Sequence, residues 1–176
     1  MDNKLRFTYN DIHLTIQAKV SVINKFKPDV IIAIGTGGFI PARMLKKHLN
    51  IPMFAVIIKL YDDITDQIAK EPEKVQWINH EQINWMKGKR VLIVDEIDDT
   101  RKTLAYCAKE FSKYGCEKVG IFVVHNKDKA KEDNITDDIE YLVGDVIPDK
   151  WAVYPWETDD IVEHDKLSLL SKIISN

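Results

Sequence analysis

A short segment near the middle of the sequence places acidic, hydroxyl and basic side chains directly after an apolar run. It reads Val91-Leu-Ile-Val-Asp95-Glu96-Ile97-Asp98-Asp99-Thr100-Arg101-Lys102-Thr103-Leu104. The apolar run predicts a buried strand, and a helix is expected to begin in the loop that follows. The unpaired N–H groups of a helix N-terminus favour a phosphate, and Thr100, Thr103 and the Lys102 amide can add donors. Asp95 and Glu96 would repel a phosphate, but they suit ribose hydroxyls and the water shell of a magnesium ion.

The same segment also has a purely structural interpretation, because Asp98, Asp99 and Thr100 are common helix-capping residues. A second loop favours the binding interpretation. The residues Gly35-Thr36-Gly37-Gly38 follow an apolar run over 29–34, and glycines let backbone N–H groups approach a pyrophosphate closely. Many glycine-rich loops are only tight turns. Together, however, the two loops predict an anion-binding site at the ends of two strands.

The remaining sequence supplies the strands and helices that must hold these loops. Helices are expected from about 12 to 23, 39 to 50, 104 to 114 and 161 to 174, and strands over 29–34, 53–58, 90–94 and 118–125. Thr8 and Asp11 predict a capping box at the start of the first helix. The alternation of strands and helices with short links predicts an α/β fold with a doubly wound parallel sheet. Such sheets bind ligands at the carboxyl ends of their strands.

Two segments depart from this alternation. Residues 59–87 are charged and weakly periodic, and they predict a long loop with a short strand near 75–77. This loop is either a lid or binding loop, or a disordered surface loop. The stretch from residue 139 onward is rich in aromatic residues. We expect one domain over residues 1–176, with a core over about 10–130 and a small hood mainly over about 139–176, to which the extreme N-terminus can contribute.

Composition narrows the class of protein. Of the 176 residues, 45% are hydrophobic and 30% are charged, as in globular proteins, and the net charge of -3 offers no bulk attraction to nucleic acid. No apolar run reaches the roughly 20 residues of a membrane helix, and the polar N-terminus lacks the pattern of a secretory signal. Cys107 and Cys116 have no metal-ligand or redox spacing. We therefore expect a cytoplasmic enzyme with no nucleic-acid or membrane partner.

The strand, acid pair and hydroxyl loop of residues 91–104 resemble the signature of the type I phosphoribosyltransferases, which binds phosphoribosyl pyrophosphate (PRPP). The family usually has a glycine where this chain has Arg101. Because arginine does not freely adopt a positive φ, either the loop tolerates a side chain or phosphate binding is altered, and Arg101 could itself reach a phosphate. The sequence Asp-Asp-Thr-Arg at this place is similar to that of the fungal-type purine-salvage members.

The resemblance implies a purine-salvage glycosyltransferase (a pentosyltransferase) that joins a 6-oxopurine base to PRPP with Mg²⁺. It implies that Asp99 accepts the proton of the purine N7 and that Tyr61 belongs to a loop that closes over the reacting centre. A cis peptide is expected at Gly35-Thr36, in the pyrophosphate loop. The PRPP-binding residues would be Gly35, Thr36, Gly37, Gly38, Asp95, Glu96, Asp98, Asp99, Thr100, Arg101, Lys102 and Thr103.

A distant segment, residues 148–157, resembles the base-binding segment of the xanthine-type enzymes of the family. By this resemblance, Lys127 donates to the 6-oxo group, Trp151 stacks on the purine and the Ala152 backbone meets the base edge. Glu157 takes the place of an aspartate that faces the exocyclic position or a second magnesium, so the implied metal ligands are Asp95, Glu96 and Glu157. The structural alternatives are a solvated surface charge for Lys127 and an aromatic core cluster for Trp151.

Two other classes of protein share parts of this pattern. One is a non-catalytic regulator that senses PRPP or a nucleotide on the same fold. The other is a phosphoacceptor signalling domain, which also carries acidic residues at strand ends, but the glycine-rich loop and the Trp151 segment do not suit it. The sequence leaves the preferred base open among hypoxanthine, guanine and xanthine. The family resemblance favours a homo-oligomer, either a dimer or a tetramer.

Overall fold

The chain folds around one six-stranded sheet. The computed structural model describes residues 3–61 and 68–174. The strand order is β4-β3-β2-β5-β6-β7, and every pair is parallel except β3 with β4, which is antiparallel. The strands are β2 (Val30–Gly35), β3 (Met53–Tyr61), β4 (Ile68–Gln76), β5 (Arg90–Asp98), β6 (Lys118–Asp128) and β7 (Glu140–Pro148).

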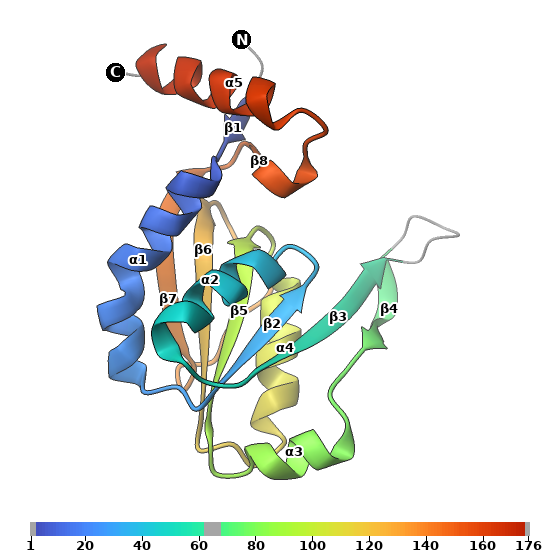
Figure 1. Ribbon diagram of the computed structural model, residues 1–176. Helices are drawn as coiled ribbons and strands as arrows, with labels where there is room; N and C mark the ends of the chain where they lie inside the picture. Colours follow the sequence, from blue (N-terminus) through green and yellow to red (C-terminus); the bar gives the residue numbers. More distant parts are fainter. Residues whose placement is uncertain (1–2, 62–67, 175–176) are drawn as a thin grey trace.

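Helices cover both faces of this sheet, as Figure 1 shows. On β2, Val30 and Ile32 pack into the cluster that contains residues of α3 (His80–Met86) and α4 (Lys102–Ser112). The alternate residue Ile31 packs into the cluster formed with α1 (Tyr9–Phe26) and α2 (Phe39–Leu49). Strands that are buried on both faces need continuous apolar sequences. The doubly wound, mostly parallel sheet predicted from the sequence is therefore confirmed.

The sheet has its switch point between β2 and β5, which are neighbours. The chain leaves β2 for α2 on one face and leaves β5 for α4 on the other face. Two loops that diverge in this way leave a crevice at the carboxyl edge of the sheet, where ligands of such folds bind. The loops at this crevice are the two loops that the sequence singled out.

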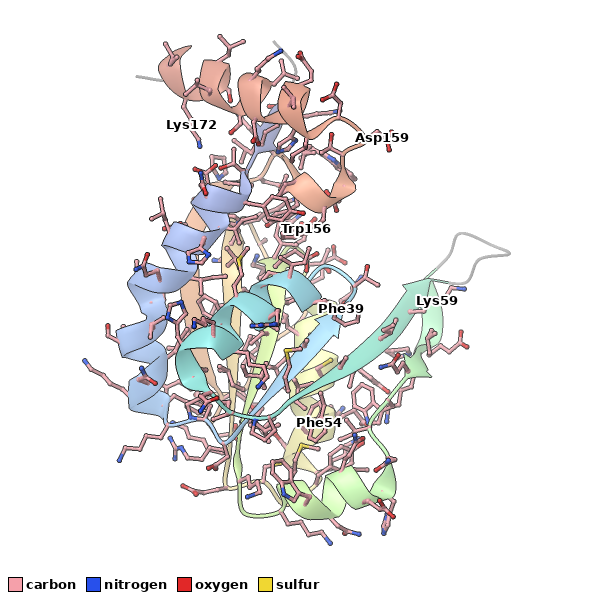
Figure 2. All side chains as sticks on the ribbon, viewed as in Figure 1. Phe39, Phe54, Lys59, Trp156, Asp159 and Lys172 are labelled. Carbon is pink, nitrogen blue, oxygen red and sulfur yellow. The ribbon has the colours of Figure 1, made fainter. Side chains whose placement is uncertain are left out.

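A small hood stands above the carboxyl edge (Figure 1). It contains β1 (Lys4–Arg6) paired in parallel with β8 (Trp151–Val153), the 3-10 turn η1 (Pro155–Glu157) and α5 (Ile161–Ile174). Ser168 Oγ of α5 donates to the Arg6 carbonyl at 2.8 Å. The Lys172 ammonium lies 2.6 Å from the Asp11 carboxylate on α1, so it ties the hood to the core (Figure 2). The N-terminus thus contributes to the hood.

The observed boundary of the hood differs from the expected one near residue 139. β7 pairs with β6 along most of its length, from Glu140 beside Gly120 to Pro148 beside Asp128, so it belongs to the core sheet. β7 is an edge strand in which Ile147 is buried and the other apolar residues are only partly buried or exposed, and this gives it a weaker sequence pattern than the central strands. β6 likewise continues to Asp128, so Lys127 lies inside the strand and not beyond its end.

The segment expected to be a long loop contains regular structure. β3 continues to Tyr61, and β4 extends well beyond the short strand expected near residues 75–77. β4 lies at the edge of the sheet, where charged residues and Pro72 are tolerated, so it shows no apolar alternation. The short helix α3 follows, and Asn79 with Gln82 forms a capping box at its start. Asn79 and Gln82 have the spacing of a capping box in the sequence, so the start of α3 could have been predicted from it. Among the residues that the structure describes, no helix has the length and apolar character to cross a membrane.

Candidate active site

A cavity of about 450 Å³ opens between the loops that follow β2 and β5. Its walls contain residues of both loops, and Trp156 and Glu157 of the hood close it from above. In Figure 2, Trp156 lies on the side of the hood that faces the core. The lining residues predicted from the sequence are Gly35, Thr36, Gly37, Asp95, Glu96, Asp98, Asp99, Thr100, Arg101, Thr103 and Glu157.

The glycine-rich loop passes so close to β5 that a side chain at Gly38 would collide with backbone atoms. A Cβ atom at Gly38 would lie 2.6 Å from the Ile34 carbonyl oxygen and 2.7 Å from the Val94 carbonyl oxygen. At Gly37 it would meet Glu96 Oε1 at 2.0 Å. The peptide between Gly35 and Thr36 is cis, as expected. At Gly37 the loop therefore presents bare backbone to the cavity beside Glu96.

The acid pair lies at the bottom of the cavity. Asp95 is only 8% exposed, and its Oδ1 accepts a hydrogen bond from the Glu96 amide at 2.9 Å. Burial first, and then the neighbouring Glu96 carboxylate, raise the pKa of Asp95 well above its usual value. Glu96 Oε2 is buried without a hydrogen-bond partner. Two crowded carboxylates with an unsatisfied oxygen suit a hard divalent cation, which would relieve both their repulsion and their desolvation.

The described residues include no group of three or more His, Cys, Asp or Glu side chains that could hold a metal by themselves. Magnesium commonly takes only one or two protein carboxylates and completes its shell with water and substrate phosphates. Asp95 and Glu96 therefore fit a magnesium ion that arrives with a phosphate ligand. Glu157 lines the same cavity, but its Oε2 accepts a hydrogen bond from the Tyr154 amide at 3.1 Å.

The loop from Asp98 to Arg101 reaches its position through an unusual backbone conformation. Arg101 has φ 74°, in the left-handed region that favours glycine, so the loop does tolerate a side chain there. The guanidinium turns back to Asp98 Oδ2, with Nε at 2.9 Å and Nη2 at 2.8 Å. The carboxylate of Asp98 is thereby engaged within the loop. Thr100 and Thr103 line the cavity, whereas the Lys102 side chain pairs with Glu132 outside it.

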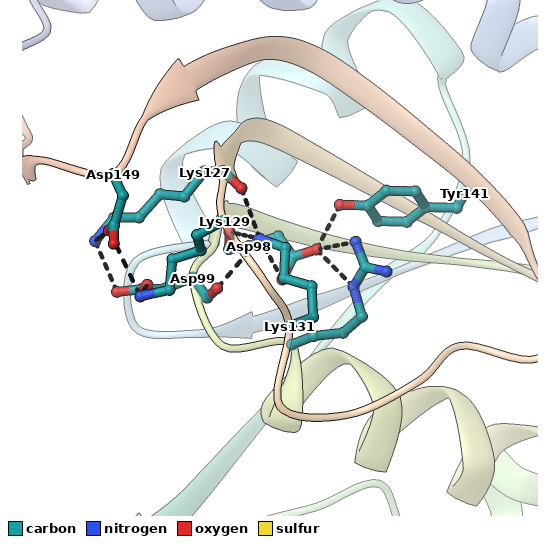
Figure 3. A network of polar contacts seen from close by, with 8 residues as sticks. Asp98, Asp99, Lys127, Lys129, Lys131, Tyr141 and Asp149 are labelled. Atoms are coloured by element: carbon teal, nitrogen blue, oxygen red, sulfur yellow. Dashed lines mark hydrogen bonds and ion pairs between the residues drawn. The ribbon is translucent and has the colours of Figure 1, made fainter.

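Asp99 and Lys127 form the centre of a network of four charges, shown in Figure 3. Lys127 Nζ lies 2.8 Å from Asp99 Oδ2, and Lys129 Nζ lies 2.7 Å from Asp99 Oδ1. Asp149 approaches the same two ammonium groups at 3.6 Å and 3.5 Å. Burial alone would raise the pKa of Asp99, but the bonds from Lys127 and Lys129 outweigh it and lower that pKa. Lys129 and Asp149 were not recognised from the sequence.

A smaller hollow of about 140 Å³ adjoins the main cavity and shares Glu96, Asp99 and Glu157 with it. It is also lined by Lys127, Trp151 and Ala152. Trp151 is 68% exposed, so it is not part of an aromatic core cluster and its ring is available to a ligand. Of the predicted site residues, Gly38 and Lys102 do not line either hollow, and the side chain of Tyr61 lies outside the described residues.

An aromatic stack joins the hood to the sheet beside these hollows. The rings of Phe7 and His125 are stacked with centroids 3.9 Å apart, and the rings of Tyr154 and Trp156 lie 4.8 Å apart and nearly parallel. His125 Nδ1 lies 2.8 Å from the Tyr154 hydroxyl, which donates to the Glu96 carbonyl oxygen at 3.2 Å. The hood is therefore bonded directly to the backbone of the acid pair.

The switch point of this doubly wound sheet combines an acid pair, a helix N-terminus of the kind that binds phosphate and a glycine-rich loop. These features define the class of protein as an α/β protein that binds nucleotides or sugar phosphates. The chain belongs to the phosphoribosyl transferase domain family, which matches residues 12–160.

Individual relatives agree with this assignment. The chain is 37% identical over 203 residues to a hypoxanthine-guanine phosphoribosyltransferase of Saccharomyces cerevisiae, covering 96% of this chain and 92% of that protein. It is 37% identical over 200 residues to xanthine phosphoribosyltransferase 1 of the same yeast, covering 95% and 96%. A crystal structure of a hypothetical protein from Neisseria gonorrhoeae with bound ppGpp is 42% identical and superposes with a TM-score of 0.86, covering 97% and 98%.

Proposed function

We propose that the chain is a 6-oxopurine phosphoribosyltransferase, which joins hypoxanthine, guanine or xanthine to PRPP and releases the nucleoside 5′-monophosphate and pyrophosphate. The observation that carries the proposal is the Lys127–Asp99 pair at 2.8 Å beside the acid pair. A 6-oxopurine presents an acceptor, the 6-oxo group, next to a donor, the protonated N7. An ammonium next to a carboxylate is the complement of that edge.

PRPP would lie along the carboxyl edge of the sheet. Its 5′-phosphate is assigned to residues 99–103, its ribose hydroxyls to Asp95 and Glu96, and its pyrophosphate to residues 35–38. The N-terminus of α4, the bare backbone of Gly37 and the cavity between the two loops support this placement. Magnesium held near Asp95 and Glu96 would neutralise charge on the leaving pyrophosphate.

The reaction moves a bond at C1′ of the ribose from pyrophosphate to a purine nitrogen. Positive charge develops on the sugar, and the carboxylates of Asp95 and Glu96, which line the cavity, would lie beside the ribose. Asp99 would accept the proton of N7 while Lys127 holds the 6-oxo group, and Trp151 would stack on the base. Most of the acceleration is then attributed to positioning and electrostatics.

A panel of four purine bases with PRPP and magnesium tests the proposal. The expected result is turnover of at least one of hypoxanthine, guanine and xanthine. Adenine, whose 6-amino group would meet the Lys127 ammonium with a donor, should be slower by at least about 100-fold. If none of the four bases is turned over, the proposed phosphoribosyltransferase activity is refuted. If adenine is the best substrate, the role assigned to Lys127 is wrong.

A second candidate is a nucleotide-sensing role for the same cleft. It is favoured by the ppGpp in the similar structure from Neisseria gonorrhoeae. The measurement is ppGpp binding by calorimetry, with and without PRPP, on protein whose turnover is known. A pure sensor would bind ppGpp and turn over none of the four bases. An enzyme whose cleft also accepts ppGpp would show inhibition that is competitive with PRPP.

We also propose a homo-oligomer, either a dimer or a tetramer, in a reducing, cytoplasmic setting. The family resemblance supports the oligomer. The two cysteines of the chain, Cys107 and Cys116, are both free thiols, which suits a reducing compartment. Light scattering on purified protein tests the oligomer, and a monomer at assay concentration would contradict it.

A further inference from the structure

Lys131 belongs to no motif recognised in the sequence, yet its ammonium is bound by three backbone carbonyl oxygens. Lys131 Nζ donates to the carbonyl of Asp98 at 2.8 Å, of Asp99 at 3.1 Å and of Lys127 at 2.9 Å. Its side chain is only 11% exposed, and Figure 3 shows Lys131 within the network of polar contacts around Asp98 and Asp99. An ammonium has three N–H donors, so all three are used. These three hydrogen bonds connect residues 98 and 99, at the end of β5, to Lys127 on β6.

The side chain of Asp98 completes this arrangement from inside the loop. Its Oδ1 lies 3.6 Å from Lys131 Nζ, and its Oδ2 accepts from Arg101 and, at 2.5 Å, from the Tyr141 hydroxyl. The Arg101 guanidinium also lies over the Tyr141 ring, 4.7 Å from its centroid. Asp98 has a fully buried side chain. A buried carboxylate needs such partners, so removing one of them would disturb the loop itself.

The backbone following Lys131 supports the same loop. The Glu132 amide donates to the Thr100 carbonyl oxygen at 3.0 Å, and the Glu132 side chain pairs with Lys102 at the first turn of α4. Lys131 and Glu132 therefore contact the loop at Asp98, Asp99, Thr100 and Lys102. No glycine is present in this loop to let the backbone turn freely. Side chains from a later part of the chain supply the restraint.

We propose that Lys131 is a positioning residue of the phosphoribosyl site. Together with Arg101 and Tyr141 it holds residues 98–101 in the shape that receives the 5′-phosphate, and it sets the separation between that loop and Lys127. The proposal rests on the proposed function. Lys131 is not assigned as a phosphate ligand, because its three donors are already bound to carbonyl oxygens. Arg101 likewise acts through Asp98 and Tyr141 instead of reaching the phosphate.

The first test compares Lys131→Met with Lys118→Met as a matched control. Lys131 follows the end of β6, whereas Lys118 is the first residue of that strand. Lys118 pairs with Glu140 away from the cavity. For Lys131→Met, we expect KM for PRPP to rise at least about 10-fold and kcat to fall, since displaced binding groups cost rate as well as affinity. KM for the base should rise as well, because the Lys127 backbone loses its bond to Lys131 and only the side-chain pair with Asp99 still joins Lys127 to the loop. Lys131→Arg should restore part of the PRPP affinity, and Lys118→Met should match the wild type.

Two further variants keep the proposal testable if Lys131→Met does not fold. Tyr141→Phe removes only the hydroxyl that bonds Asp98, and Arg101→Gly supplies the residue usual in the family without the ion pair. Both should raise KM for PRPP several-fold with KM for the base nearly unchanged, and their melting temperatures report whether folding is affected. If both keep wild-type KM for PRPP, the proposal is wrong. If the wild-type protein shows no turnover, the proposed function is refuted instead. In that case, the PRPP affinity of the same variants, measured by calorimetry, would still test whether residues 98–101 are held in the binding shape.

Discussion

The buried histidine between hood and sheet makes the stability of the fold depend on pH. His125 is 2% exposed, it stacks on Phe7, and it bonds to the Tyr154 hydroxyl. Burial lowers the pKa of His125 from 6.5 to about 4, because the charged imidazolium is poorly solvated there. The unfolded chain therefore binds a proton at this residue between pH 6.5 and about 4, and the folded chain does not.

The magnitude follows from the two proton affinities. Each factor of ten in affinity is worth about 1.4 kcal/mol, so the difference between 6.5 and about 4 corresponds to about 3 kcal/mol. This contribution to the free energy of unfolding is fully present above pH 6.5 and is lost as the pH falls toward 4. Between pH 7 and pH 5 the loss attributable to His125 should be about 2 kcal/mol. The hood should loosen first, since Tyr154 links His125 to the Glu96 carbonyl.

Urea unfolding of the wild type and of His125→Gln at several pH values between 7 and 5 measures the contribution of His125 to the free energy of unfolding. Glutamine can still bond to Tyr154 but does not titrate, so its absolute stability will be lower while its pH dependence is shallower. Any other group that titrates in this range does so in both proteins. The difference between the two slopes of unfolding free energy against pH therefore isolates the histidine. Parallel loss of stability in the two proteins would show that His125 is not held neutral by its burial.

Three substitutions test the site directly. Gly38→Ala should destabilise the fold by about 1–3 kcal/mol in urea unfolding, because its Cβ meets the carbonyl oxygens of Ile34 and Val94 at 2.6 and 2.7 Å; unchanged stability would contradict the close approach. Trp151→Ala should raise KM for the purine about 10-fold in steady-state assays and leave KM for PRPP unchanged, since a stacked base is worth about 1–3 kcal/mol; a change confined to PRPP would refute the stacking role. Asp99→Asn should lower turnover by about 100-fold or more with PRPP affinity nearly constant by calorimetry, and wild-type turnover would remove Asp99 from the proposed proton transfer.

Local patterns were enough to predict the framework and the position of the cavity. The apolar runs before Gly35 and Asp95 are strands because both faces are buried, and a polar loop after such a run must emerge at the carboxyl edge. The capping box of Thr8 with Asp11 and the extent of α5 were also readable and are confirmed. Each of these features depends on residues that are close together in the sequence.

Features that depend on tertiary neighbours were not predictable in the same way. β4 is a charged edge strand that exists because β3 offers it hydrogen bonds, and β7 is recognisable mainly by its pairing with β6. Lys129 and Asp149 resemble any solvated charges in the sequence, and only the fold brings them to Asp99. A periodicity argument contains no information about such partners, since it considers only one segment at a time.

Arg101 illustrates why a departure from a family motif cannot be judged within the motif. From the sequence alone, a side chain at a position usually held by glycine implied either a tolerant loop or altered phosphate binding. The structure keeps the positive φ and surrounds the loop with partners that lie 33 and 43 positions from Asp98, namely Lys131 and Tyr141. Backbone strain at Arg101 is therefore offset by bonds to a buried carboxylate, and arginine is the residue that can form them. Introducing glycine at this position should therefore weaken PRPP binding, although glycine relieves the strain.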